Sequence, residues 1–221
     1  GVLYNKCSVK RKKCLRYATI CSNAGFLGNP IAQGVFGMMG LTLASIYLIP
    51  QRIMMWSEGV SVFTEAPTKK EMLKKIFTHP CIIACEIGIV LMLTGWRPPH
   101  FLEETITSVS NCNTAMSMLV IGMILADADP KTIIDKDVLF YTFIRLLIIP
   151  FCVFIPCWLL HTDSLVMGVS VILAAMPAGA TTTILASKYD CEEEFSVKLV
   201  VFSTAASLIT TPLWNMILLK F

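Results

Sequence analysis

Charged side chains are scarce in this sequence, and the shortage excludes an ordinary soluble domain. Only 15% of the 221 residues are Asp, Glu, Lys or Arg, whereas 55% are hydrophobic. Soluble domains contain about 25% charged and about 45–50% apolar residues. The mean hydropathy is +0.70, and the few charges gather between long uncharged stretches. Both deviations indicate helices that lie in a lipid bilayer.

Residues suited to catalysis or metal binding are also few. The three histidines show no spacing typical of a Ser-His-Asp triad or a metal site. The nine cysteines contain no Cys-x-x-Cys motif, so we interpret them as packing residues rather than metal ligands. The sequence therefore predicts no enzyme, no cofactor and no metal. The chain opens on Gly1 rather than Met, and we expect a further N-terminal portion to precede it.

Long apolar segments are what the sequence has instead. A helix needs about 20 mostly apolar residues to cross about 30 Å of hydrocarbon. Seven segments meet this requirement: 17–38, 41–62, 80–97, 104–126, 138–160, 165–187 and 195–219. Segments such as Leu139 to Leu160 are continuously apolar, without the alternation that barrel strands show. The predicted fold class is all-α, a polytopic transmembrane helical bundle.

The positive charges predict an orientation. If the gaps between spans alternate in side, one side receives most of the 18 Lys and Arg, including the basic run at 10–13. The other side receives only Arg97 and Lys220. Because Lys and Arg favour cytoplasmic loops, the chain is expected to start in the cytoplasm and end outside, in the plasma membrane. The basic start is explained by this rule, and nucleic-acid binding is not expected.

Two spans carry a proline in their middle. Pro30 and Pro177 each remove a backbone donor and clash with the preceding turn, and Pro30 also disfavours a helical conformation at Asn29. We therefore expect the first span to break near Asn29-Pro30 and the sixth near Pro177. A simple kink is the alternative for each. Two interrupted spans in matching positions favour a transport site, since broken helices present free amides to an anion.

Other polar groups lie inside the predicted spans. Asn111 and Asn113 occur in the fourth span and cannot face the same direction on a helix. They either line a cavity or form hydrogen bonds between helices, and the sequence does not decide between these two roles. Arg52, Glu86 and Arg145 lie deeper than loop residues should. We favour a structural ion pair between Glu86 and Arg145, with a proton-coupling role for Glu86 as the alternative.

With these segments assigned, the sequence resembles the auxin efflux carrier family of membrane transport proteins. The resemblance rests on Asn23-Ala-Gly-Phe-Leu-Gly-Asn-Pro30, on Ala174-Ala-Met-Pro177 and on the stretch from Leu208 to Trp214. It implies ten helices in two inverted five-helix repeats, with two broken helices that cross at the substrate site. The chain would lack the first three helices. It would then comprise the rest of the first repeat (1–63), a cytoplasmic linker (64–79) and the complete second repeat (80–221).

The resemblance also implies a site and a function. The expected substrate-binding residues are Asn23, Asn29, Pro30, Gln33, Asn111, Asn113, Pro177, Thr181 and Thr182. The expected function is secondary transport of a small organic anion by alternating access, with a coupled proton or sodium ion. A homodimer is left open. The alternative from another class is a non-transporting seven-helix receptor or scaffold, which the predicted cytoplasmic start disfavours.

Overall fold

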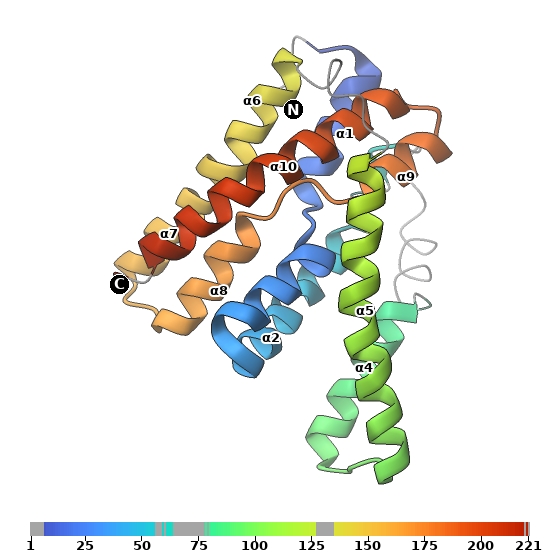
Figure 1. Cartoon of the computed structure of the whole chain (residues 1–221), viewed down its shortest axis with the longest axis vertical. Helices are drawn as coiled ribbons and strands as arrows, with labels where there is room; N and C mark the ends of the chain where they lie inside the picture. The colour runs from blue at the N-terminus through green and yellow to red at the C-terminus, as the bar shows by residue number, and fades with distance from the viewer. Residues whose placement is uncertain are drawn as a thin grey trace.

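The computed structural model describes residues 7–55, 59, 61–63, 78, 80–126, 135–218 and 220, and this part of the chain is an all-α membrane helical bundle (Figure 1). Its elements are α1 (Val9–Ile20), η1 (Ala24–Gly28), α2 (Asn29–Met54), α4 (Pro80–Thr94), α5 (His100–Ala126), α6 (Lys136–Phe143), η3 (Ile144–Ile148), α7 (Ile149–Leu159), α8 (Ser164–Ala174), α9 (Thr181–Lys188) and α10 (Glu193–Leu218). Among the described residues, three helical stretches have the length and apolar composition to cross a membrane: Lys136–Leu159, Glu193–Leu218 and Ala24–Met54, the last of which turns at Gly37. The predicted fold class is confirmed.

The five later predicted spans each coincide with helices. The segments 80–97 and 104–126 correspond to α4 and α5, which form a hairpin. Its far end extends away from the other helices (Figure 1), while α5 contacts η1 and α10. The segment 138–160 corresponds to α6, η3 and α7, which run on as one helix, and 195–219 corresponds to α10. Most of the predicted linker 64–79 lies outside the described residues.

The first helix begins earlier than predicted. The sequence placed its start at residue 17, but α1 begins at Val9 and includes the basic run. Ser8 caps the helix by accepting a hydrogen bond from the amide of Arg11, 3.2 Å away. Lys and Arg are also good helix formers. The basic run is therefore part of a helix, in which Lys10 and Arg11 pair with acidic residues.

The predicted break at Asn29-Pro30 is wrong, because both residues are helical. The interruption comes earlier, at residues 21–23, between α1 and η1. The turn from Ala24 to Gly28 is a π-helix, in which the amide of Asn29 bonds to the carbonyl of Ala24. A proline clashes with the carbonyl four residues before it, and the wider π-turn makes room for Pro30.

Helix α2 is two arms joined at Gly37. This glycine has φ 66° and ψ −158°, a conformation essentially reserved for glycine. The second arm returns toward the first interruption, where the Gln51 side chain donates to the Ser22 carbonyl at 3.1 Å and to its hydroxyl at 2.8 Å. The turn lies within two residues of the predicted gap between the first two spans. The return of the chain brings Gln51 and Arg52 to the interruption.

The helix from α6 to α7 shows the same solution to a buried proline. A π-turn, η3, precedes Pro150, whose ring leaves the carbonyl of Leu146 without its usual helical donor. The indole of Trp214 on α10 supplies that donor at 2.9 Å. Trp214 is 2% exposed, so this hydrogen bond joins two helices inside the core.

The hydrophobic core has two parts, and each contains half of each interrupted helix. One cluster joins residues of α1 and α9, such as Leu15 and Leu185. The other joins residues of η1, α2 and α8, such as Leu27 and Leu173. The two interrupted helices therefore cross between the clusters, with α1 beside α9 and α2 beside α8.

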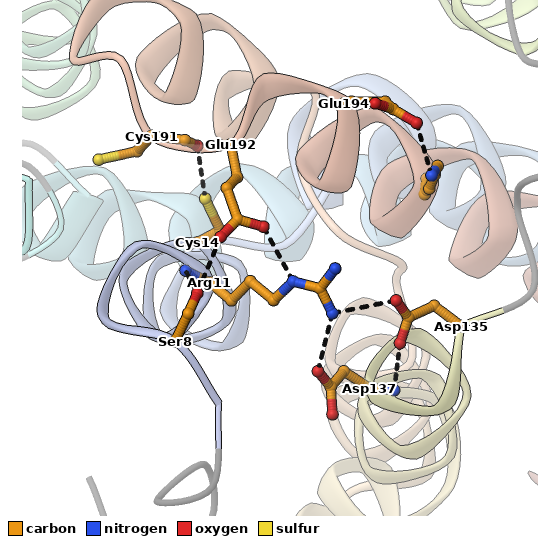
Figure 2. A network of polar contacts seen from close by, with 9 residues as sticks. Ser8, Arg11, Cys14, Asp135, Asp137, Cys191, Glu192 and Glu194 are labelled. Atoms are coloured by element: carbon orange, nitrogen blue, oxygen red, sulfur yellow. Dashed lines mark hydrogen bonds and ion pairs between the residues drawn. The ribbon is translucent and has the colours of Figure 1, made fainter.

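At one end of the bundle, Arg11 holds three segments together (Figure 2). Its guanidinium bonds Glu192 at 2.8 Å, Asp135 at 3.0 Å and Asp137 at 3.2 Å. Partial burial alone would raise the pKa of Glu192, but hydrogen bonds from Ser8 and Arg11 outweigh it and hold the pKa below its ordinary 4.5. Arg11 thereby joins the start of α1, the start of α6 and the loop between α9 and α10. The distribution of Lys and Arg predicted that these three segments lie on the same side of the membrane.

Replacing Arg11 with glutamine should lower the free energy of unfolding by about 1–2 kcal/mol, because charged hydrogen bonds are lost and screening limits the effect at a partly exposed site. Thermal unfolding in detergent measures this. A folded-state pKa below 4.5 at Glu192 means that its stabilisation is present above pH 4.5 and is lost as pH falls below that value.

Lys10 provides the matched control for this prediction. It pairs with Asp190 at 3.5 Å with both side chains largely exposed, so Lys10→Gln should change the unfolding free energy by less than about 0.5 kcal/mol. Equal effects of the two substitutions would contradict the role assigned to Arg11.

Candidate functional site: the crossing of two interrupted helices

The two interruptions are bonded to each other through their backbones. The amide of Asn23 donates to the carbonyl of Pro177 at 2.8 Å, and the amide of Gly179 donates to the carbonyl of Cys21 at 3.1 Å. Ser22 and Ala178 thereby form an isolated antiparallel bridge. Backbone freed from a helix must find new partners in a membrane. The two interruptions supply each other with those partners, which fixes the crossing point.

Close packing of the crossing requires a residue without a side chain. A Cβ on Gly179 would lie 3.1 Å from the carbonyl oxygen of Cys21 and 3.4 Å from that of Ser22. The amide of Ala178 donates a hydrogen bond to the hydroxyl of Ser203 on α10, at 3.1 Å. The small residues after Pro177 therefore permit the contact that the sequence pattern suggested.

Arg145 neutralises the carbonyl ends of both broken helices. Its guanidinium donates to the carbonyl of Thr19 in the last turn of α1 at 3.3 Å, and to that of Met176, just after α8, at 2.9 Å. Arg145 is 5% exposed and lies in the π-turn η3. Helix C-termini carry partial negative charge, so this buried cation stabilises two such ends at once.

The opposite, amide ends of the broken helices lie beside a cavity. By helix geometry the first amides of η1 and α9 have no partner within their helices. Among the described residues, the amides of Gly25, Phe26, Ala180 and Thr181 donate to no other backbone group outside their own helix. All four residues line a small cavity of about 20 Å³ that opens to the outside.

Asn23 is the buried polar side chain of this cavity. It is 3% exposed, lines the cavity and makes no side-chain hydrogen bond with another described residue. A ligand in this cavity can therefore accept a hydrogen bond from the Asn23 side-chain amide. The other polar lining residues are Ser22, Gln51, Arg52 and Thr181.

A second cavity adjoins the first at Gly25, which lines both. It lies between α2 and α5 and brings together four of the predicted site residues: Asn29, Pro30, Gln33 and Asn111. Its volume is about 340 Å³, so it is much larger than the inner cavity. The predicted site residues thus divide between an inner cavity at the crossing and an outer cavity beside α5.

Comparison with known proteins decides the family. A family model described as "Membrane transport protein" matches residues 3–215. The chain belongs to the membrane transport protein family. The resemblance seen in the sequence is thereby confirmed at the level of this family, and the helices are those of a membrane transport protein.

Curated relatives of this membrane transport protein are named uncharacterized transporters. The chain is 27% identical to one from Methanothermobacter thermautotrophicus over 92% of its own length and 67% of the relative. It is 24% identical to one from Methanocaldococcus jannaschii, over 91% and 67%. A relative from Escherichia coli K12 is 21% identical over 86% and 63%. The chain thus spans about two thirds of these relatives.

Of the remaining predicted site residues of this family member, Pro177 and Thr182 do not line the inner cavity. Pro177 contributes its carbonyl to the crossing through the bond from Asn23. Thr182 is fully buried and does not line the inner cavity, while its neighbour Thr181 does. The side chain of Asn113 lies outside what the structure describes.

The predicted ion pair between Glu86 and Arg145 is wrong. Glu86 is exposed on α4, whereas both hydrogen-bonding nitrogens of Arg145 go to the carbonyls of Thr19 and Met176. Backbone carbonyls compete with carboxylates for a buried guanidinium, and the helix ends lie nearer. Sequence reasoning also missed Gln51, because its approach to Ser22 depends on the turn at Gly37.

Proposed function

We propose that this chain forms the substrate-binding part of a secondary transporter, which carries a small organic anion by alternating access. The substrate's carboxylate lies in the inner cavity, bonded by the Asn23 amide and the free amides that begin η1 and α9. The observation that carries the proposal is the side chain of Asn23, which is buried where the two interruptions cross and bonds no other described residue. Helix N-termini favour negative charge through their dipoles and free amides.

The outer cavity is the route to this site in our proposal. It shares Gly25 with the inner cavity and is lined by both polar and apolar side chains, among them Gln33, Leu41 and Asn111. Because α5 forms one wall and α2 the other, a shift of the α4–α5 hairpin against the remaining helices would open or close it. Such a shift is the alternating-access step, and the inverted repeat of the family resemblance supplies its symmetry.

The remaining expectations belong to the same proposal. The carrier lies in the plasma membrane, with the Arg11 end of the bundle in the cytoplasm, and a proton or a sodium ion is coupled to transport. Glu86, exposed on α4, is the carboxylate available to a coupled proton on the hairpin that moves. A homodimer would be held through surfaces away from the crossing.

Asn23→Ala should reduce carboxylate flux into proteoliposomes at least about 10-fold, since a hydrogen bond to a charged group contributes about 1.5–3 kcal/mol. Pro177→Ala should reduce it as well, by allowing α8 to continue across the interruption. Labelled mono- and dicarboxylates are the substrates to assay.

Thr105→Ala on α5 is the control, because this exposed hydroxyl only bonds the carbonyl of Phe101 in its own helix. Its flux should match that of the unaltered protein, and all variants should insert into the membrane. Unchanged flux in both Asn23→Ala and Pro177→Ala would contradict the site.

A further inference from the structure

We infer that Arg52 makes the inner cavity select a single carboxylate, a specificity-determining role that rests on the proposed function. Arg52 lies on the returning arm of α2, beyond the turn at Gly37. It lines the inner cavity together with Asn23 and Thr181. The turn therefore delivers a cation to the side of the crossing where the helices present their free amides.

The guanidinium of Arg52 rests against the first turn of η1. A Cβ on Gly25 would lie only 2.6 Å from its Nη2 atom, so the absence of a side chain at Gly25 creates the space that the guanidinium occupies. A group at this position adds a full positive charge to the partial charge of the helix end.

Arg52 differs from the two other arginines that hold this fold together. Arg11 donates hydrogen bonds to three carboxylates, and Arg145 donates to two backbone carbonyls. Among the described residues, none forms a hydrogen bond or ion pair with the Arg52 side chain. Its partly buried guanidinium is thus available to a ligand, and it is the one charged side chain among the described residues that line the inner cavity.

The charge balance of the cavity specifies the ligand. A guanidinium binds a carboxylate through two parallel N–H···O bonds, which an uncharged carboxamide cannot reproduce. One carboxylate balances the one cation of this lining. A second carboxylate on the same molecule would enter without a cation to offset its desolvation. The cavity should therefore prefer a monocarboxylate both to its amide and to a dicarboxylate of equal chain length.

Three matched sets of probes test the inference: butyrate, butyramide and succinate; hexanoate, hexanamide and adipate; benzoate, benzamide and terephthalate. Binding to the purified full chain is measured by calorimetry for the unaltered protein, Arg52→Gln and Arg52→Lys. In Arg52→Gln the preference for carboxylate over amide should fall about 10- to 100-fold. In Arg52→Lys it should fall less, because the charge stays while the paired geometry is lost.

Two further variants separate position from charge. Gly25→Ala keeps the charge but displaces the guanidinium, and should weaken carboxylate binding while amide binding stays the same. Arg16→Gln removes an exposed cation of α1 and should leave every preference unchanged. Thermal unfolding of each variant shows whether it is folded.

The outcomes distinguish the inference from the proposed function. If the unaltered protein binds none of the carboxylates, the proposed function itself is contradicted. Binding of carboxylates with the same preference in Arg52→Gln as in the unaltered protein would contradict the role of Arg52 alone. Binding of the dicarboxylates as tightly as the monocarboxylates would contradict selection of a single carboxylate.

Discussion

Replacing Arg145 with glutamine should abolish carboxylate flux and lower the free energy of unfolding by about 2–4 kcal/mol, the cost of unpairing buried carbonyls. The carbonyls of Thr19 and Met176 belong to the two different broken helices, and Arg145 bonds both. A glutamine is shorter, carries no charge and cannot reach both. The two interrupted helices should therefore be held less firmly at their crossing. The inner cavity depends on the geometry of this crossing.

Proteoliposome flux and thermal unfolding in detergent measure the two effects. Arg145→Lys should be intermediate, because the charge remains while the fixed fork of donors is lost. Arg16→Gln removes a cation from an exposed position and should change neither quantity. Full flux and full stability in Arg145→Gln would show that the crossing holds without this cation.

Replacing Gly37 with alanine should cost about 1–3 kcal/mol, the usual strain of a residue held in a sparsely populated backbone conformation. Its φ of 66° and ψ of −158° suit glycine alone. The same strain would also shift the returning arm of α2, which brings Gln51 and Arg52 to the inner cavity. We therefore expect carboxylate binding to weaken together with stability.

Gly34 is the matched control, three residues away in the same helix. A Cβ there would meet nothing within 4 Å, and alanine favours a helix over glycine by about 1 kcal/mol. Gly34→Ala should therefore be neutral or stabilising, with binding intact. Calorimetric binding and thermal unfolding of the two variants should give opposite results; equal behaviour would rule out a required turn at Gly37.

The positions of the helices could be predicted because apolar length is a local property of the sequence. The spans from residue 80 onward coincide with helices, and the interruption at Pro177 was recognisable from the small residues that follow it. Pro30 was misleading, since a proline indicates a missing donor but not the π-turn that accommodates it. The actual interruption at 21–23 contains no proline, and it is stabilised by its pairing with the second interruption and by Gln51.

The partners of the buried polar groups could not be predicted in the same way. A sequence shows that Arg145 needs a counter-group, and it makes Glu86 the visible choice. Backbone carbonyls at helix ends are equally good acceptors but have no signature in the sequence. The same limit applies to Gln51 and Arg52, whose positions follow from a turn fourteen or fifteen residues earlier. Contacts that depend on chain reversal require the folded structure.

Locating a bound carboxylate tests the central claim most directly. A brominated monocarboxylate soaked into crystals of the protein can be found by its anomalous scattering. The account predicts the carboxylate within hydrogen-bonding distance of the Asn23 side chain, between the first turns of η1 and α9. A carboxylate bound instead in the apolar groove lined by Leu27, Ile31 and Thr211 would contradict it.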